Sequence, residues 1–279
     1  MTDDKSPILR LNSVCKTYEL KGQQAVQALQ NVNLAVYPGE CLGIVGQSGS
    51  GKSSLAKCVT QLEHVNSGEI WYRQQEITRL RGEKLRRMRK QIQMVFQEPS
   101  MIFNPRMKIG MFICEPLLNY KLMKGPQAVQ ETRKLLERVG LSASDADKYP
   151  HELSGGQQQR AVIARAIGVR PEIIIFDEAT SALDVSIQQQ ILDLLMELRR
   201  ETAVSSIFIS HDLAVVQQVS DRIAVMHQGK VVEVLDSARL SSSANHSYTR
   251  SLMSSALSLR KLKDEMQKRE RVVVLAESI

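Results

Sequence analysis

The segment Gly46-Gln47-Ser48-Gly49-Ser50-Gly51-Lys52-Ser53 has the residue types and spacing of a phosphate-binding loop. Glycines allow backbone N–H groups to turn inward around phosphates, and a helix N-terminus adds a partial positive charge. We expect Lys52 to neutralise the β- and γ-phosphates of a nucleotide and Ser53 to ligate Mg²⁺. The residues expected to line the nucleotide are Gly46, Gln47, Ser48, Gly49, Ser50, Gly51, Lys52, Ser53 and Ser54.

Two adjacent carboxylates follow the apolar run 173–176 and could complete this site. Asp177 suits Mg²⁺ coordination, directly or through water, and Glu178 suits the general base that polarises an attacking water. A positioned base contributes about 10²–10⁴-fold in rate. Acids also end many surface strands, but their place downstream of an intact phosphate loop favours the catalytic interpretation.

A third motif, Leu153-Ser154-Gly155-Gly156-Gln157, precedes an expected helix over about 157–166. A side-chain hydroxyl and exposed backbone N–H groups at a helix N-terminus can bind an anion. The alternative is a structural role, in which Ser154 only caps the helix.

These motifs, in this order, resemble the ATP-binding cassette (ABC) ATPases over about residues 8–236. The resemblance implies that 153–157 closes over the ATP of a partner chain, so that the protein works as a dimer. It also implies that Ser181-Ala182-Leu183-Asp184 lies at the dimer interface, with Asp184 as its acidic residue.

The same resemblance assigns four further residues. Tyr18 matches the aromatic that stacks on adenine, and Val26 an apolar contact near the sugar and base. Gln97 matches the glutamine that reaches Mg²⁺ and couples to membrane subunits, and His211 the histidine that contacts the γ-phosphate. Tyr18 alone could also be an edge-strand aromatic.

Within the family, three segments are similar to the peptide/nickel importer subfamily. These are 99–107 (PSMIFNPRM), 149–157 (YPHELSGGQ) and 246–252 (HSYTRSL). Ser247 stands where that pattern has proline, and the longer cysteine-containing tail of many relatives is not seen. The resemblance therefore gives no support to an iron–sulfur site and leaves the solute open.

The resemblance implies an ATP-hydrolysing subunit that uses ATP and Mg²⁺ to drive uptake of oligopeptides, dipeptides or a related solute such as chelated nickel. The implied partners are a second ABC ATPase subunit, identical or not, two integral membrane permeases and, indirectly, an extracytoplasmic solute-binding protein. The implied location is peripheral, on the cytoplasmic face of the inner or plasma membrane. The retained Ser154, Gly156, Glu178 and His211 give no sign of a degenerate partner.

Two alternatives belong to other classes: a soluble ABC-type ATPase in a phosphonate-degrading complex, or one acting on nucleic acid. Against nucleic acid, aromatic residues make up only 4% of the chain, and no coiled-coil insertion separates Lys52 from Ser154. The net charge of +7 fits a basic surface beside a membrane. The acidic start, 1–4, predicts no secretory signal, and no apolar run approaches the ~20 residues of a membrane helix.

Elements that position these motifs follow from hydrophobic periodicity. We expect an α/β fold: a P-loop NTPase core of ABC type, an antiparallel β subdomain and a helical signature subdomain at about 98–167. The ABC domain would span 1–236, with a C-terminal extension at 237–279. Strands are expected near 31–37, 41–45, 68–72, 92–96, 173–176 and 206–209, helices at 53–65 and 187–200, and a hairpin joining 223–226 to 231–234. Val129, Leu136 and Val139 are expected to form one helix face ending at Gly140, and Arg79–Lys90 a basic amphipathic helix.

Overall fold

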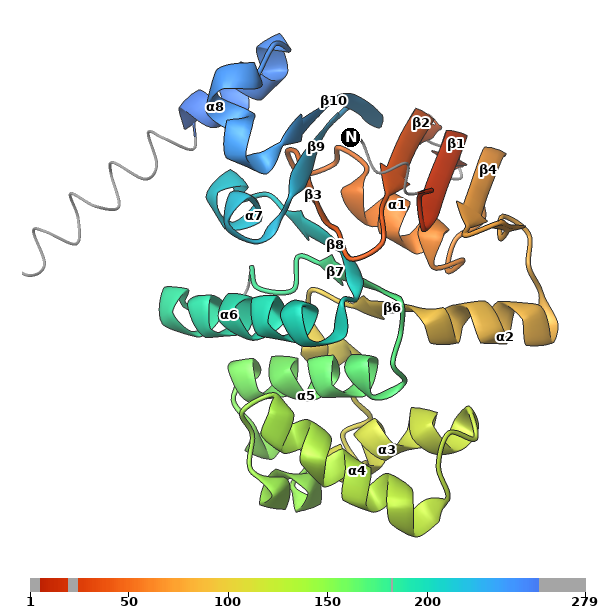
Figure 1. Ribbon diagram of the computed structural model, residues 1–279, viewed down its shortest axis with the longest axis vertical. Helices are drawn as coiled ribbons and strands as arrows, with labels where there is room; N and C mark the ends of the chain where they lie inside the picture. Colours follow the sequence, from red (N-terminus) through yellow and green to blue (C-terminus); the bar gives the residue numbers. More distant parts are fainter. Residues whose placement is uncertain (1–5, 20–24, 182, 256–279) are drawn as a thin grey trace, which may run out of the picture.

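A computed structural model describes residues 6–19, 25–181 and 183–255 (Figure 1). The charged and apolar parts of the expected C-terminal extension, beyond 255, lie outside the described residues, as does Ala182 of the expected interface motif. Among the described helices, none is long and apolar enough to cross a membrane.

A six-stranded sheet forms the centre of the molecule, in the order β10-β9-β3-β8-β7-β6. All neighbours are parallel except the β9–β10 hairpin. The strands are β3 (Cys41–Val45), β6 (Ile92–Val95), β7 (Ile173–Asp177), β8 (Ser205–Ser210), β9 (Arg222–His227) and β10 (Lys230–Asp236). The expected hairpin is confirmed, and the helix expected at 187–200 is α6 (Val185–Thr202), which joins the parallel strands β7 and β8.

The parallel strands β3, β7 and β8 are buried along their whole length, because both faces of the sheet are covered. Along β7, Ile173 and Ile175 enter one core, while Ile174 and Phe176 enter the other. The first core contains α1 (Lys52–Val59) and the small sheet. The second contains residues of α3 (Ile109–Asn119), α4 (Gly125–Arg138), α5 (Gly155–Gly168), α6 and α7 (Leu213–Val219).

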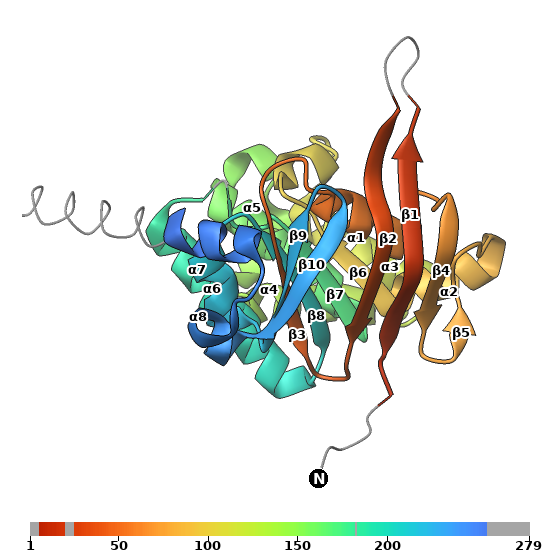
Figure 2. The same ribbon diagram turned by 90° about the horizontal axis from the view of Figure 1, so that it is seen from above.

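The small sheet is antiparallel, in the order β2-β1-β4-β5, and lies beside the central sheet (Figure 2). Its strands are β1 (Leu9–Tyr18), β2 (Val26–Val36), β4 (Ser67–Tyr72) and β5 (Gln75–Glu76). Leu9, Leu11 and Ile70 are fully buried against the same core as α1. This packing fixes the helix that carries the end of the phosphate loop.

Helices α3, α4 and α5 pack on one another as a separate group below the sheets in Figure 1. The short 3-10 turn η1 (Pro99–Ile102) precedes α3, and the turns η2 (Ala143–Asp147) and η3 (Pro150–Glu152) lie between α4 and α5. Gly140 follows α4 with a φ of 76°, as expected for a C-terminal stop. One expected core residue is wrong: Val129 is 53% exposed, and the buried stripe runs through Ala128, Thr132 and Leu135.

Other boundaries also differ from expectation. The helix after the phosphate loop ends at Val59, not near Val65, because the chain turns at Gln61, whose φ is 56°. The basic amphipathic helix is α2 (Gly82–Gln91), which buries Met88, and Arg79 lies before it. In the C-terminal part, η4 (Ser237–Arg239) and α8 (Leu240–Ser243) are short, and residues 247–255 are helical.

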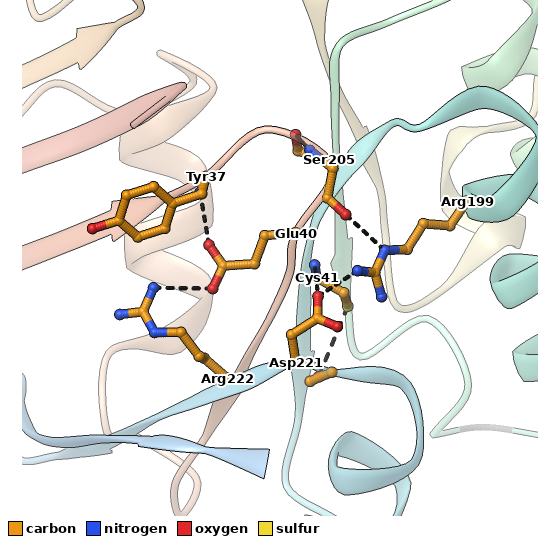
Figure 3. Close-up of polar contacts among 9 residues, drawn as sticks. Tyr37, Glu40, Cys41, Arg199, Ser205, Asp221 and Arg222 are labelled. Atoms are coloured by element: carbon orange, nitrogen blue, oxygen red, sulfur yellow. Dashed lines mark hydrogen bonds and ion pairs between the residues drawn. The ribbon is translucent and has the colours of Figure 1, made fainter. Parts of the chain in front are cut away.

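A polar network ties the amino ends of β3, β8 and β9 together, at the edge of the sheet away from the phosphate loop (Figure 3). Arg222 Nη1 lies 2.9 Å from Glu40 Oε1, and the Cys41 N–H donates to Asp221 Oδ2 over 2.8 Å. Arg199 pairs with Asp221 and donates to the Gly39 carbonyl. The strands are thereby anchored at one edge while the other edge carries the candidate site.

Candidate functional site

The carboxyl ends of β3, β8, β7 and β6 lie next to one another, because these strands are parallel neighbours. The phosphate loop follows β3, His211 follows β8, Asp177 ends β7, and Gln97 stands two residues after β6. Ligand sites of open parallel sheets lie at this edge. Sheet topology alone therefore gathers four of the motifs found in the sequence.

The phosphate loop is wrapped closely by neighbouring backbone. Gly51 has a φ of 101°, and a Cβ placed there would lie 2.3 Å from the Ala28 carbonyl oxygen, so only glycine fits. The Gly229 N–H, in the β9–β10 turn, donates to the Ser50 carbonyl over 3.1 Å. Helix α1 then begins at Lys52, which directs its N-terminus toward the loop.

Lys52 is only 4% exposed and lies inside the loop. Its ammonium donates to the Gly46 carbonyl over 2.8 Å and to the Gln47 carbonyl over 3.0 Å. Burial lowers the pKa of this ammonium below its ordinary value, and the nearby carboxylates of Glu178 and Asp177 oppose that shift. Lys52 is thus a buried cation inside the phosphate loop, where it donates to two uncharged backbone carbonyls.

Ser53 and Asp177 meet across 124 positions of sequence, the hydroxyl donating to Asp177 Oδ1 over 3.0 Å. Burial raises the pKa of Asp177 above its ordinary value, while the Ser53 hydrogen bond lowers it. Mg²⁺ takes oxygen ligands at about 2.1 Å in octahedral geometry, so two adjacent ligand oxygens lie about 3.0 Å apart. The pair therefore fits the donor set and the spacing that this ion requires.

Glu178 follows Asp177 and turns toward β8. Its backbone has a left-handed φ of 49°, and its N–H donates to the Ile209 carbonyl over 3.0 Å. Its carboxylate Oε2 lies 3.4 Å from His211 Nδ1. Strained backbone of this kind, about 1–3 kcal/mol, is typical of functional sites.

The remaining candidates of this half-site lie at its rim. Gln97 is exposed beyond β6. Tyr18 and Val26 face each other as register partners of β1 and β2, and Val26 is 52% exposed. The Tyr18 hydroxyl lies 3.5 Å from Ser54 Oγ, which places its ring beside the start of α1.

Ser154 is the N-cap of α5 in a capping box. Its hydroxyl accepts the Gln157 N–H over 3.3 Å, and its own N–H donates to Gln157 Oε1 over 2.9 Å. Ser154 and Gly155 are exposed, whereas Leu153 and Gly156 are buried. The hydroxyl proton is still available to a ligand, because the hydroxyl acts only as an acceptor within the cap.

Gly156 lies where α5 meets the start of α6. A Cβ at this position would lie 2.6 Å from Ile187 Cγ2, whereas a Cβ at Gly155 would meet nothing nearer than 4.0 Å. Asp184 caps α6, accepting the Ile187 N–H over 2.9 Å. Ile187 therefore connects the two motifs: it packs against Gly156 of the motif 153–157, and Asp184 of the expected interface motif 181–184 accepts its N–H.

Two residues that contact expected site residues were not predicted from the sequence. The Lys16 ammonium lies 4.7 Å from the centre of the Tyr18 ring. Because side chains two residues apart on a strand lie on the same face of the sheet, the sequence could have indicated this contact. Tyr248 reaches the loop from the C-terminal part: its hydroxyl accepts the Gln47 N–H over 3.0 Å. It lies in the HSYT segment, to which no role had been assigned.

Comparisons with known proteins agree with this geometry. A family model described as ABC transporter matches residues 29–181. The chain is 43% identical over 256 residues to a glutathione import ATP-binding protein of Escherichia coli O157:H7, covering 90% of this chain and 41% of that protein. It is 40% identical over 279 residues to the protein of the same name from Salmonella choleraesuis, covering 98% and 44%. The chain therefore spans less than half the length of these relatives.

Solved structures give the same fold. A dimeric ATP-binding cassette in a post-hydrolysis state with ADP and phosphate has a TM-score of 0.75 at 32% identity, covering 82% of this chain and 98% of that one. A cassette from Clostridium perfringens, part of an ABC transporter complex, has a TM-score of 0.75 at 24% identity, covering 94% and 100%. The expected α/β fold class is confirmed.

Proposed function

The chain belongs to the ABC transporter family, and on that premise we propose that it is the ATP-hydrolysing subunit of an importer of small peptides or a related solute. The observation that carries this proposal is the meeting of the phosphate loop, Asp177, Glu178 and His211 at one edge of the sheet. Family membership also agrees with the resemblance inferred from residues 153–157.

In the proposed reaction, Lys52 exchanges its two carbonyl partners for the β- and γ-phosphates of ATP. Ser53 and Asp177 would hold Mg²⁺, and the ion would supply charge withdrawal from the phosphate oxygens. Glu178 accepts a proton from the attacking water, and His211, beside its carboxylate, contacts the γ-phosphate. Tyr18 and Val26 receive the adenine and sugar at the rim.

We propose that this half-site is completed by a second cassette. Ser154 and Gly155 are exposed at the N-terminus of α5, where the partial positive charge favours a phosphate. Asp184 and the exposed Val185 at the start of α6 extend that surface; Val185 is 68% exposed. The partner is a second ABC ATPase subunit, identical or not, whose γ-phosphate this motif covers.

For the permease contact we propose the surface beside Gln97. Met101 is 80% exposed and Met111 is 55% exposed, both close in sequence to Gln97. The resemblance also implies that the helical region around 103–114 docks the membrane subunits, but Phe103 and Cys114 at its two ends are buried in the core and cannot contact a partner. Such exposed methionines suit an adaptable apolar contact. The resulting location is peripheral, on the cytoplasmic face of the membrane.

The substrate class is proposed from the relatives, whose names state glutathione import. Glutathione is a small peptide, which agrees with the subfamily resemblance of segments 99–107 and 246–252. ATP drives the cycle in this proposal, while the permeases and the extracytoplasmic solute-binding protein select the solute.

Purification of the tagged chain from detergent-solubilised membranes tests the proposal. The expected result is co-purification with integral membrane permeases, reduced by Met101→Glu and Met111→Glu. The control is Val129→Glu, which changes an apolar side chain of similar exposure on α4. Recovery with soluble enzymes of phosphonate breakdown, or strongly salt-dependent duplex binding without permeases, would overturn it.

A further inference from the structure

The C-terminal segment 245–255 contacts the phosphate loop through the side chain of Tyr248. The Tyr248 hydroxyl accepts the Gln47 N–H over 3.0 Å, joining residues 201 positions apart. The N–H of Gln47 and the carbonyl of Gly46 belong to the same peptide group. That carbonyl accepts the Lys52 ammonium over 2.8 Å. A single rigid peptide plane therefore connects Tyr248 to the lysine of the loop.

Tyr248 is itself held from two sides. Its ring stacks on His227, the last residue of β9, with centroids 3.9 Å apart and planes 29° from parallel. Its N–H donates to His246 Nδ1 over 3.2 Å. Glu233, on β10, accepts the N–H groups of Asn245 and His246 over 2.8 and 3.2 Å. The hydroxyl is thus fixed in direction by the central sheet.

The geometry points to Tyr248 as a positioning residue for nucleotide binding, and this inference rests on the proposed ATP site. By holding the Gly46–Gln47 peptide from outside, Tyr248 keeps the loop in the orientation in which Lys52 faces its mouth. A loop that is already ordered loses less conformational entropy when it binds phosphates. Because the peptide keeps its place whether or not Lys52 has moved to a phosphate, Tyr248 acts on ATP binding and not on the chemical step.

The test is Tyr248→Phe, which keeps the ring stacked on His227 and removes only the hydroxyl. One hydrogen bond contributes about 0.5–1.5 kcal/mol, so we expect the KM for ATP to rise about 2- to 10-fold. The kcat should stay within about two-fold of wild type. The matched control is Tyr37→Phe, since the Tyr37 ring packs against Arg222 at the opposite edge of the sheet.

A second variant tests the anchor. Glu233→Ala frees the segment that orients Tyr248, without touching the loop, and should raise the KM in the same direction. If Glu233 acts through Tyr248, the double variant should have the KM of Tyr248→Phe alone. Thermal unfolding of each variant separates a loss of folding from a loss of positioning.

Three outcomes would overturn the inference: an unchanged KM in Tyr248→Phe, a loss confined to kcat, or fully additive effects of the two changes. Failure of the proposed ATP site has a different result, since the wild-type chain would then not bind a fluorescent ATP analogue at all.

Discussion

The Ser53 hydroxyl lies 3.0 Å from Asp177 Oδ1, and this contact joins the end of the phosphate loop to the end of β7. Both side chains are placed by secondary structure: Ser53 by the first turn of α1 and Asp177 by the last position of a buried strand. Two oxygen donors are therefore already at the spacing of neighbouring Mg²⁺ ligands. The donor pair does not depend on a mobile loop.

From this pair we predict that Asp177→Asn raises the Mg²⁺ concentration needed for tight ATP binding by at least about 10- to 100-fold, since even a change of an outer-shell partner of a metal site has an effect of this size. The amide keeps the shape but loses the charge. Titration of Mg²⁺ at fixed nucleotide measures the shift. Asp193→Asn, on the exposed side of α6, is the control. An unchanged Mg²⁺ requirement would remove Asp177 from the proposed ligands.

Gly156→Ala should displace α5 from α6, because the Cβ of the new alanine would lie 2.6 Å from Ile187 Cγ2. Overpacking of this kind costs about 1–3 kcal/mol. Gly155→Ala, with no neighbour nearer than 4.0 Å, should leave the free energy of unfolding nearly unchanged. Adding Ile187→Ala to Gly156→Ala should relieve the clash and restore part of the lost stability. Equal effects of the two alanines in urea unfolding would contradict this packing argument.

The two sheets are linked by Glu172, which accepts hydrogen bonds from the Tyr72 hydroxyl over 2.5 Å and from Arg73 Nε over 2.8 Å. Burial raises the pKa of Glu172, but the hydrogen bonds from Arg73 and Tyr72 outweigh it and hold that pKa below its ordinary value. The folded pKa is thus lower than the unfolded one. This carboxylate therefore adds stability above the unfolded pKa, and the contribution is lost as the pH falls through the folded pKa.

Accordingly, Glu172→Gln should lower the free energy of unfolding by about 1 kcal/mol at pH 7. This value is low for a hydrogen bond to a charged group, because solvent partly screens the carboxylate. The difference from wild type should begin to shrink as the pH falls below the ordinary pKa of a glutamate carboxyl, and it should vanish only below the lower pKa of the folded state. Urea unfolding at several pH values measures this, and the control is Glu197→Gln, which changes an exposed side chain of α6. A difference that does not vary with pH would argue against the charged pair.

Much of the half-site follows from sequence because each of its residues adjoins an apolar strand. Asp177 and Glu178 come at the end of a run of isoleucines, and His211 directly follows β8. Once those runs are taken as parallel strands, their ends must meet at one edge. The roles of these residues remain predictions until the variants are measured.

Other features depend on information that local patterns do not carry. The Tyr248–Gln47 contact spans 201 positions, and no periodicity indicates it. Leu136 and Val139 are buried as expected, but Val129 was misplaced because a spacing of seven residues before Leu136 also fits a helix face, while the buried residue of that turn is its neighbour Ala128. The end of α1 was missed because Gln61 adopts a left-handed conformation that glutamine rarely takes.

The most direct test of the account is Glu178→Gln, because it isolates the proposed base from nucleotide binding. The amide cannot accept the proton of water, so steady-state hydrolysis should fall at least about 100-fold. ATP should still bind and should now hold two cassettes together, which light scattering after size exclusion measures as an ATP-dependent dimer. Near-normal hydrolysis by the equally folded variant would contradict the account.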